Sequence, residues 1–398
     1  MNQTSSAVLF ILSISVGVAM IGLGIIWPLI PVYAVELGAG GFLVGIIIAS
    51  FNIARTIFSP FVGRISDRWG RKIFIAAGLM FYAIVSILYS FSKDAQALIF
   101  IRFFHGLASL LVVPIAMALA ADLAPRQKLG LYMGTLNMAV MLGLGVGPAL
   151  GGIIRDHFGM NAAFYSMGAL ALLTCLLVLI RLPCDKEMQG TKEYKSATSI
   201  KTILSHRVVL GILIMRFFAA SGQGAVYTFL PVLALHLQLT SSQVGIILTA
   251  NIFLIAFLQR SSGRLSDRVN PKNLVITGTL ASGMTVFGMP FVEGFMMILL
   301  LNILMGMANG VSLPGGLVIT GQLGHTMGMA SLMSLTDAAW SLGMIVSPIL
   351  SGIILDVLGL PSVFIIGSLL ILAGGVAVAI FLRDYQPLRD HQKGTKPQ

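Results

Sequence analysis

Charge is scarce in this chain of 398 residues: Asp, Glu, Lys and Arg together make up only 10% of it. A soluble globular protein carries roughly 25% charged residues. Hydrophobic residues reach 57%, and the mean hydropathy is +0.95. So little charge cannot cover a folded surface in water, so the composition excludes an ordinary soluble domain.

Several kinds of chemistry are also missing. The only two cysteines, Cys175 and Cys184, lack metal-ligand spacing, and we expect neither a disulfide nor a metal site. There is no GxxxxGK[ST] phosphate loop and no catalytic constellation, which excludes the obvious signs of an ATPase or another enzyme. The first 35 residues contain no Lys or Arg, so we interpret residues 7–34 as a retained first span rather than a cleaved signal peptide.

Long apolar runs are abundant instead. Each is about 20 residues or longer, enough to cross a bilayer as a helix. Inside lipid only helices and closed barrels satisfy their own backbone, and continuous runs favour helices. We therefore predict an all-α membrane protein with twelve spans. They lie near 7–34, 41–62, 73–92, 95–120, 129–154, 161–181, 207–236, 241–262, 273–292, 294–320, 327–355 and 361–382.

The chain also repeats itself. The charged stretch Gly63–Lys72 recurs 200 positions later as Gly263–Lys272. Other matches at this offset are Pro31 with Pro231, Gly45 with Gly245, Gly106 with Gly306, Pro114 with Pro314, Pro148 with Pro348, Asp156 with Asp356 and Gly159 with Gly359. The predicted organisation is a six-helix bundle at 1–181, a linker at 182–206, a second six-helix bundle at 207–382 and a tail at 383–398. A duplicated membrane protein of this kind indicates a transporter.

The placement of the basic residues explains the net charge of +11. On the predicted topology twenty of them fall on one face, and only Lys93 and Arg155 fall on the other. Basic loops mark the cytoplasmic side, so both termini are expected to be cytoplasmic. The partner implied by the charge is therefore the lipid bilayer, and nucleic acid is not expected.

The first copy of the repeat matches G-x-x-x-D-R-x-G-R-[RK] and resembles the signature loop of the major facilitator superfamily. The resemblance covers nearly the whole chain. It implies two parallel halves, a bacterial-type inner membrane and a gate latch, with Asp122 as a plausible partner of Arg71. The residues of this latch are Gly63, Asp67, Arg68, Gly70, Arg71 and Asp122. The second copy has Asn270 and Pro271 where the first has Gly and Arg, so it should latch less well.

Span five carries a second motif. It resembles the G-x-x-x-G-P-x-x-G-G motif of the family's proton-coupled exporters, through Gly143, Gly147, Pro148, Gly151 and Gly152. The resemblance implies antiport, with the proton gradient as the energy source and no cofactor. The alternative is ordinary close packing of membrane helices at glycine.

Four ionisable residues lie deep inside spans: Arg55, Arg102, Arg216 and Asp337. Such residues are costly in hydrocarbon and are functional candidates, although a structural ion pair is the alternative. Arg55 and Asp337 lie about 12 and about 15 Å from the cytoplasmic end. Spans two and eleven face each other in the family, so we expect an Arg55–Asp337 pair, with Arg216 as a rival. The resemblance of span four implies that Arg102 acts in proton transfer or holds the cavity.

Polar side chains in the spans that line the family's cavity are candidates for substrate binding. A mostly apolar pocket with a few polar anchors suits amphiphilic small molecules. The candidates are Trp27, Asn52, Asn137, Gln223, Tyr227, Asn251, Asn302, Asn309 and Trp340.

The sequence therefore predicts a secondary transporter that exports amphiphilic or drug-like molecules by proton antiport with alternating access. Its partners would be the small-molecule substrate and protons, and a monomer suffices because the chain carries both halves. Three embedded Arg against one Asp leave open an organic anion or siderophore-like metabolite. A non-transporting receptor or sensor on the same scaffold is the alternative of another class, which a flux assay would separate.

Overall fold

The computed structural model describes residues 3–124, 128–182, 203–266, 268–383 and 385–386, and in these residues it is helical throughout. The first half contains α1 (Gln3–Ile26), α2 (Leu29–Glu36), α3 (Gly41–Trp69), α4 (Arg71–Ser90), α5 (Ala95–Leu123), α6 (Leu129–Phe158) and α7 (Met160–Arg181). The second half contains α9 (Arg207–His236), α10 (Ser241–Ser266), α11 (Pro271–Gly288), η3 (Met289–Phe291), α12 (Phe295–Met327), α13 (Met329–Leu358) and α14 (Leu360–Phe381).

The described part of the chain has 12 helical spans long and apolar enough to cross a membrane, which confirms the predicted number. The first span is broken at Trp27 and Pro28, between α1 and α2. The charged repeat is mostly helix, not loop, because α3 continues to Trp69. The chain breaks only at Gly70, whose φ of +96° favours glycine.

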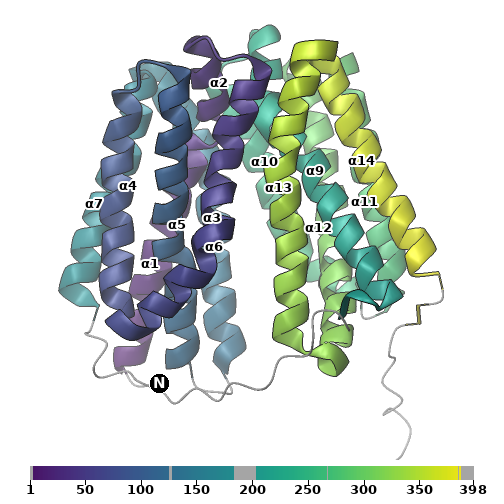
Figure 1. The fold of residues 1–398 in the computed structure, drawn as a ribbon, viewed down its shortest axis with the longest axis horizontal. Coiled ribbons are helices and arrows are strands. Elements are labelled where there is room, and N and C mark those ends of the chain that lie inside the picture. Colours follow the sequence, from purple (N-terminus) through teal and green to yellow (C-terminus); the bar gives the residue numbers. More distant parts are fainter. Residues whose placement is uncertain (1–2, 125–127, 183–202, 267, 384, 387–398) are drawn as a thin grey trace, which may run out of the picture.

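The two halves stand side by side, with the first half in purple and blue and the second in green and yellow (Figure 1). They meet mainly through two helix pairs related by the repeat, α3 with α13 and α6 with α10, and α2 also contacts α9. The start of α1 and the end of α14 lie at the same end of the bundle (Figure 1), as an even number of spans requires. We call this the inner end and the opposite one the outer end, following the orientation expected from the basic residues.

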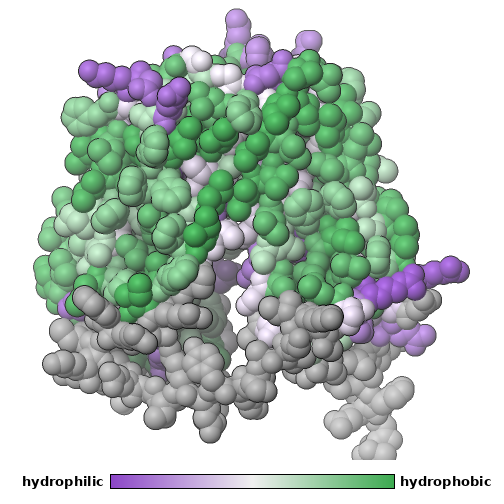
Figure 2. All heavy atoms as spheres, viewed as in Figure 1, coloured by the Kyte–Doolittle hydropathy of each residue, from purple (hydrophilic) through white to green (hydrophobic). Residues whose placement is uncertain are grey.

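The halves touch near the outer end and part towards the inner end. A Cβ on Gly45 would lie 2.2 Å from the carbonyl oxygen of Pro348, and one on Gly245 would lie 2.3 Å from that of Pro148. Lower down, Figure 2 shows the surface hollowed between the halves, below a broad apolar band. We call this opening the central hollow. The conformation is therefore closed at the outer end and open towards the inner end.

Candidate functional site: the central hollow and its charges

An acidic and a basic side chain from two helices of the second half come together in the spans. Nη2 of Arg216 on α9 lies 3.8 Å from Oδ1 of Asp337 on α13, and 81% of the Asp337 side chain is exposed. The Arg216 guanidinium also stacks on Trp340, 4.7 Å from the ring centroid. Because a carboxylate inside a span is stable only where water reaches it, Asp337 faces the central hollow rather than lipid.

This arrangement corrects the predicted Arg55–Asp337 pair. In this structure the partner of Asp337 is the rival Arg216, and Asp337 is exposed rather than buried. Arg55 instead lies beside the Phe51 ring, 5.7 Å from its centroid. Counting residues predicts depth along a helix, but it does not fix direction around the axis. The α13 backbone lies against α3 at Gly45, and the Arg55 guanidinium lies by the Phe51 ring instead.

A second cation is enclosed in the first half. Arg102 on α5 is 2% exposed, and its guanidinium lies 4.6 Å from the centroid of Phe51. His105 packs edge-on against Phe51 and Tyr82, and Tyr89 Oη lies 3.1 Å from its Nδ1. Arg102 Nε and Nη1 have no hydrogen-bond partner among the described residues. The face of the Phe51 ring therefore stabilises this cation, where a carboxylate would be the usual partner.

Five predicted cavity residues are instead buried inside the second half. Gln223 Nε2 donates to Asn309 Oδ1 at 3.1 Å, and Tyr227 donates to Asn251 Oδ1 at 3.3 Å. Asn251 Nδ2 donates in turn to the Asn302 carbonyl at 2.8 Å. These bonds join α9, α10 and α12. In this conformation these side chains bond to one another, and their part in binding substrate stays a prediction.

The remaining cavity candidates are more accessible. Trp27, at the break between α1 and α2, packs its ring 5.0 Å from that of Tyr227 and so connects the halves. Asn52 on α3 and Trp340 are half-buried, and Asn137 on α6 is exposed. Asn137 stands 200 positions before Asp337, so the two halves present an amide and a carboxylate at equivalent positions.

The glycines of the span-five motif are contact points for other helices. Gly143, Gly147 and Gly151 face α1, and a Cβ on Gly151 would lie only 2.5 Å from the backbone oxygen of Ile25. Gly152 instead faces α10 across the halves. The motif therefore lets α6 pack closely on one helix of each half. Its link to antiport stays a prediction.

The predicted contact of the signature loop is present. Arg71 Nη1 lies 2.7 Å from Asp122 Oδ2, which joins the start of α4 to the end of α5. Gly70 provides the turn before Arg71. Three further predicted latch residues belong to the last turns of α3, and their side chains lie outside the described part of the structure: Gly63, Asp67 and Arg68.

The second copy of the loop is built differently. Pro271 begins α11, and the side chain of Asn270 accepts a hydrogen bond from Lys272 N at 3.1 Å. Asp122 is replaced by Gln322, which accepts a hydrogen bond from Tyr385. Burial raises the pKa of Tyr385 to about 12, so its hydroxyl remains a donor. This copy therefore has a neutral contact where the first has an ion pair.

The sequence matches the model of the Major Facilitator Superfamily over residues 12–233 and 212–398. It is 29% identical to an uncharacterized MFS-type transporter, MJ1560, of Methanocaldococcus jannaschii over 92% of this chain and 96% of the relative. It is 26% identical to Multidrug resistance protein 2 of Bacillus subtilis over 89% and 90%. It is also 26% identical to Multidrug resistance protein MdtG of Escherichia fergusonii over 87% and 88%.

Solved structures agree on the fold. A bacterial homologue of the human lysosomal transporter Spinster, in an inward-facing and occupied conformation, superposes with a TM-score of 0.84 at 12% identity, covering 97% of this chain and 98% of that one. The nucleoside transporter NupG gives a TM-score of 0.78 at 15% identity over 97% and 100%.

Proposed function

The chain belongs to the Major Facilitator Superfamily, and from that premise we propose that it exports amphiphilic, drug-like molecules in exchange for protons. It is a multi-pass membrane transporter and not an enzyme. The names of the Bacillus and Escherichia relatives support multidrug export as the finer function. We further propose a bacterial-type inner membrane, cytoplasmic termini, a working monomer and no cofactor beyond the proton gradient.

The observation that carries the proposal is the Arg216–Asp337 pair beside the central hollow. At 3.8 Å, and with most of the Asp337 side chain exposed, the pair is loose and reachable by water. An exposed ion pair of this kind contributes only about 0–1 kcal/mol. Separating Asp337 from Arg216 therefore costs little, which is what a coupling site needs.

In the proposed cycle, deprotonated Asp337 holds Arg216 while the substrate enters from the inner end. Trp340, stacked on Arg216, offers an aromatic surface for an amphiphile beside that charge. After the halves rock and the outer end opens, a proton from outside neutralises Asp337. Arg216 then loses its partner, and the change in charge favours release of substrate and return to the inner-open state.

An organic anion is the second candidate substrate, and the first half supports it. Arg55 and Arg102 form no ion pair with any carboxylate among the described residues. A buried cation without a counter-ion is costly, so it is best explained if it attracts negative charge. On this alternative the substrate or its carboxylate would approach the α3–α5 side of the hollow.

Dye and drug accumulation in cells lacking their own exporters tests the proposal. We expect wild type to lower accumulation, and Asp337→Asn or a protonophore to abolish the effect. Glu293→Gln removes an exposed acid outside the spans and serves as the matched control, with wild-type export expected. Full protonophore-sensitive export by Asp337→Asn would refute proton coupling through Asp337. No effect on any compound in a broad panel would favour the anion alternative, tested next by metabolite profiling.

A further inference from the structure

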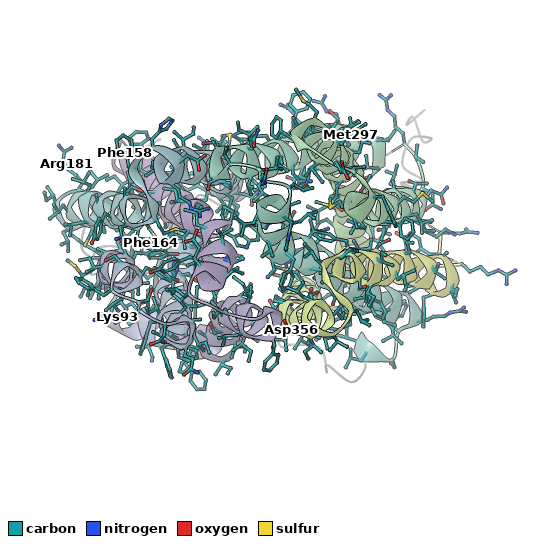
Figure 3. The ribbon with its side chains drawn as sticks, turned by 90° about the horizontal axis from the view of Figure 1, so that it is seen from above. Lys93, Phe158, Phe164, Arg181, Met297 and Asp356 are labelled. Carbon is teal, nitrogen blue, oxygen red and sulfur yellow. The ribbon has the colours of Figure 1, made fainter. Side chains whose placement is uncertain are left out.

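Asp356, at the outer end of α13, binds the start of a helix in the other half. Its two carboxylate oxygens accept hydrogen bonds from the backbone N–H groups of Gly41, at 2.7 Å, and Phe42, at 2.8 Å. These are the first two residues of α3. Seen from above in Figure 3, Asp356 lies where the second half meets the first.

Asp156, 200 positions earlier, makes the reciprocal contact. Its oxygens accept hydrogen bonds from the N–H groups of Ser241, at 3.1 Å, and Ser242, at 2.7 Å, at the start of α10. Each half thus gives one carboxylate to a helix of the other. All four bonds cross between the halves at the outer end.

Helix starts favour such a partner for two reasons. Their first N–H groups have no partner inside the helix, and the helix dipole attracts negative charge. The residue before α3 is Gly40, which has no side chain to cap the helix. The start of α10 has its own cap as well, because Thr240 and Gln243 exchange hydrogen bonds between side chain and backbone. The start of α3 therefore depends on Asp356 more than the start of α10 depends on Asp156.

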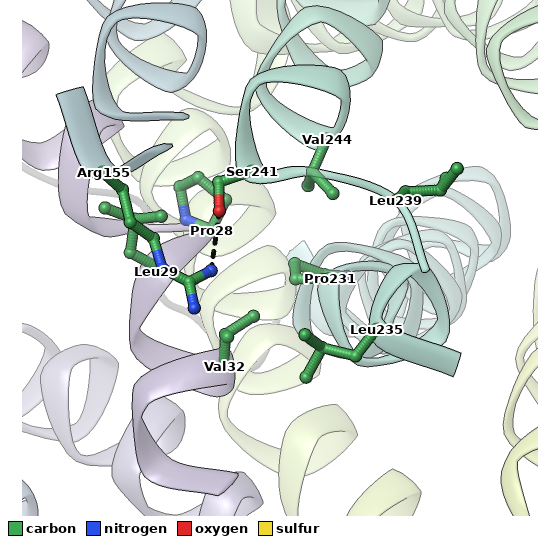
Figure 4. Close-up of a pocket in the computed structure, with 9 residues that line it drawn as sticks. All are labelled: Pro28, Leu29, Val32, Arg155, Pro231, Leu235, Leu239, Ser241 and Val244. Atoms are coloured by element: carbon green, nitrogen blue, oxygen red, sulfur yellow. Dashed lines mark hydrogen bonds between the residues drawn. The ribbon is translucent and has the colours of Figure 1, made fainter. Parts of the chain in front are cut away.

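The surroundings are tightly closed. A Cβ on Gly41 would lie 2.6 Å from the carbonyl oxygen of Gly352, so the backbones of α3 and α13 touch. Beside Asp156, Arg155 donates to Ser241 Oγ at 2.7 Å (Figure 4). Arg155 also pairs with Glu36 of α2. The cavity around this contact measures only about 10 Å³. The space beside this contact therefore holds about one water molecule.

We propose that Asp156 and Asp356 form an outer latch, which holds the outer end closed while the inner end is open and must release in every transport cycle. The inference rests on the alternating access of the proposed function and on no particular substrate or proton site. The four bonds join elements that have to separate when the outer end opens. The same aspartates that the duplication preserved are thus positioning residues for the conformational cycle.

The latch is not expected to be symmetric in strength. Loss of Asp356 leaves the first N–H groups of α3 with no cap, whereas loss of Asp156 leaves α10 with its own cap. Losing a helix cap typically changes an equilibrium about fivefold. We expect Asp356→Ala to raise the ratio of outer-open to outer-closed molecules at least about fivefold and Asp156→Ala to raise it less.

Distance measurements between spin labels test this directly. Labels would be placed at Asn161→Cys and Glu293→Cys, exposed positions in opposite halves, on a background with Cys175→Ala and Cys184→Ala. The purified full-length protein would be measured in lipid nanodiscs without substrate or gradient. Asp94→Ala is the matched control, because Asp94 caps α5 of its own half through Ala97 N at 2.7 Å.

The latch predicts longer outer distances for Asp356→Ala, an intermediate shift for Asp156→Ala and none for Asp94→Ala. Distances in both latch variants equal to wild type would overturn it. Should a variant not survive purification, Val244→Cys, which lines the small cavity beside this contact, can be labelled in intact cells with an impermeant maleimide. Faster labelling in the latch variants supports the proposal, and an unchanged rate contradicts it. Neither readout needs transport, so failure of the proposed substrate or coupling would be recognised separately in the flux assay.

Discussion

The two halves fill the same helix contact with opposite chemistry. Between α3 and α5 of the first half, Phe51 holds the cation of Arg102. At the equivalent contact between α10 and α12, 200 positions later, the residues are Asn251 and Asn302, joined by a hydrogen bond of 2.8 Å. One half thus encloses a charge on an aromatic ring, and the other encloses neutral amides that bond to each other.

The ion pair of Arg216 with Asp337, in contrast, belongs to the second half. Asp337, Arg216 and Trp340 belong to the second half, and their equivalents in the first half are uncharged. Both halves keep the two outer aspartates and the glycines at the contact between the halves: Gly45 with Gly245 and Gly152 with Gly352. The comparison teaches that the duplicated positions build the moving scaffold, whereas charge chemistry was assigned separately to each half.

The largest effect is expected where the halves differ in packing. A methyl group on Gly151 would meet the Ile25 backbone at 2.5 Å, which cannot move aside without shifting α1. Gly151→Ala should therefore lower the unfolding free energy by about 1–3 kcal/mol, as overpacking does. Thermal unfolding in detergent measures this. The equivalent position in the second half, Ser351, already carries a side chain, and Ser351→Ala should change stability little.

The matched control for that prediction lies on the same helix. Nothing lies within 4 Å of a Cβ on Gly134, so Gly134→Ala should leave stability unchanged or raise it slightly. Equal melting temperatures for Gly151→Ala and Gly134→Ala would show that the contact of α6 with α1 is not tight.

The next contrast separates structure from function. Asn251→Leu removes two buried hydrogen bonds and should destabilise the protein by about 1–3 kcal/mol. Arg102→Leu removes an enclosed cation without a carboxylate partner, so it should leave stability unchanged or raise it. Its transport should nevertheless fall, because the charge is kept for function. Thermal unfolding and flux, measured together, would show whether stability and transport separate in this way.

The smallest effect is expected at the inner end. Asp122→Asn breaks the ion pair with Arg71, which is partly exposed and worth about 1 kcal/mol or less. Transport should fall by about two- to fivefold. Gln322→Ala, at the equivalent position of the second half, should have no comparable effect. A larger loss of transport from Gln322→Ala than from Asp122→Asn would contradict the assignment of the signature-loop latch to the first half.

Much of the fold could be predicted from the sequence, because span length, apolar runs and a fixed repeat are properties of the chain itself. The twelve spans and the Arg71–Asp122 contact were predicted in this way. The partner of Asp337 was not, because depth follows from counting residues but direction depends on how the helices pack. Counting residues predicts similar depths for Arg55 and Arg216, and in the structure it is Arg216 that lies beside Asp337.

Polar residues in spans raised the same difficulty. Asn251 and Asn302 are polar groups that hydrocarbon would penalise, which made them candidates for a water-filled cavity. In the structure they are fully buried and satisfy part of their bonding within the second half. Hydrophobic periodicity and composition do not distinguish a polar residue that lines a cavity from one that is hydrogen-bonded inside the bundle. The contacts of Asp156 and Asp356 could not be predicted for another reason. Both residues lie at span ends, where acidic residues are common, and their bonding partners belong to the opposite half.

The most direct test of the account uses purified protein in vesicles with an imposed proton gradient and a fluorescent amphiphile. Wild type and Glu293→Gln should accumulate the dye against its gradient. Asp337→Asn should catalyse exchange of dye down its gradient yet fail to use the proton gradient, since the carboxylate that receives the proton is gone. Gradient-driven accumulation by Asp337→Asn at the wild-type level would contradict the account.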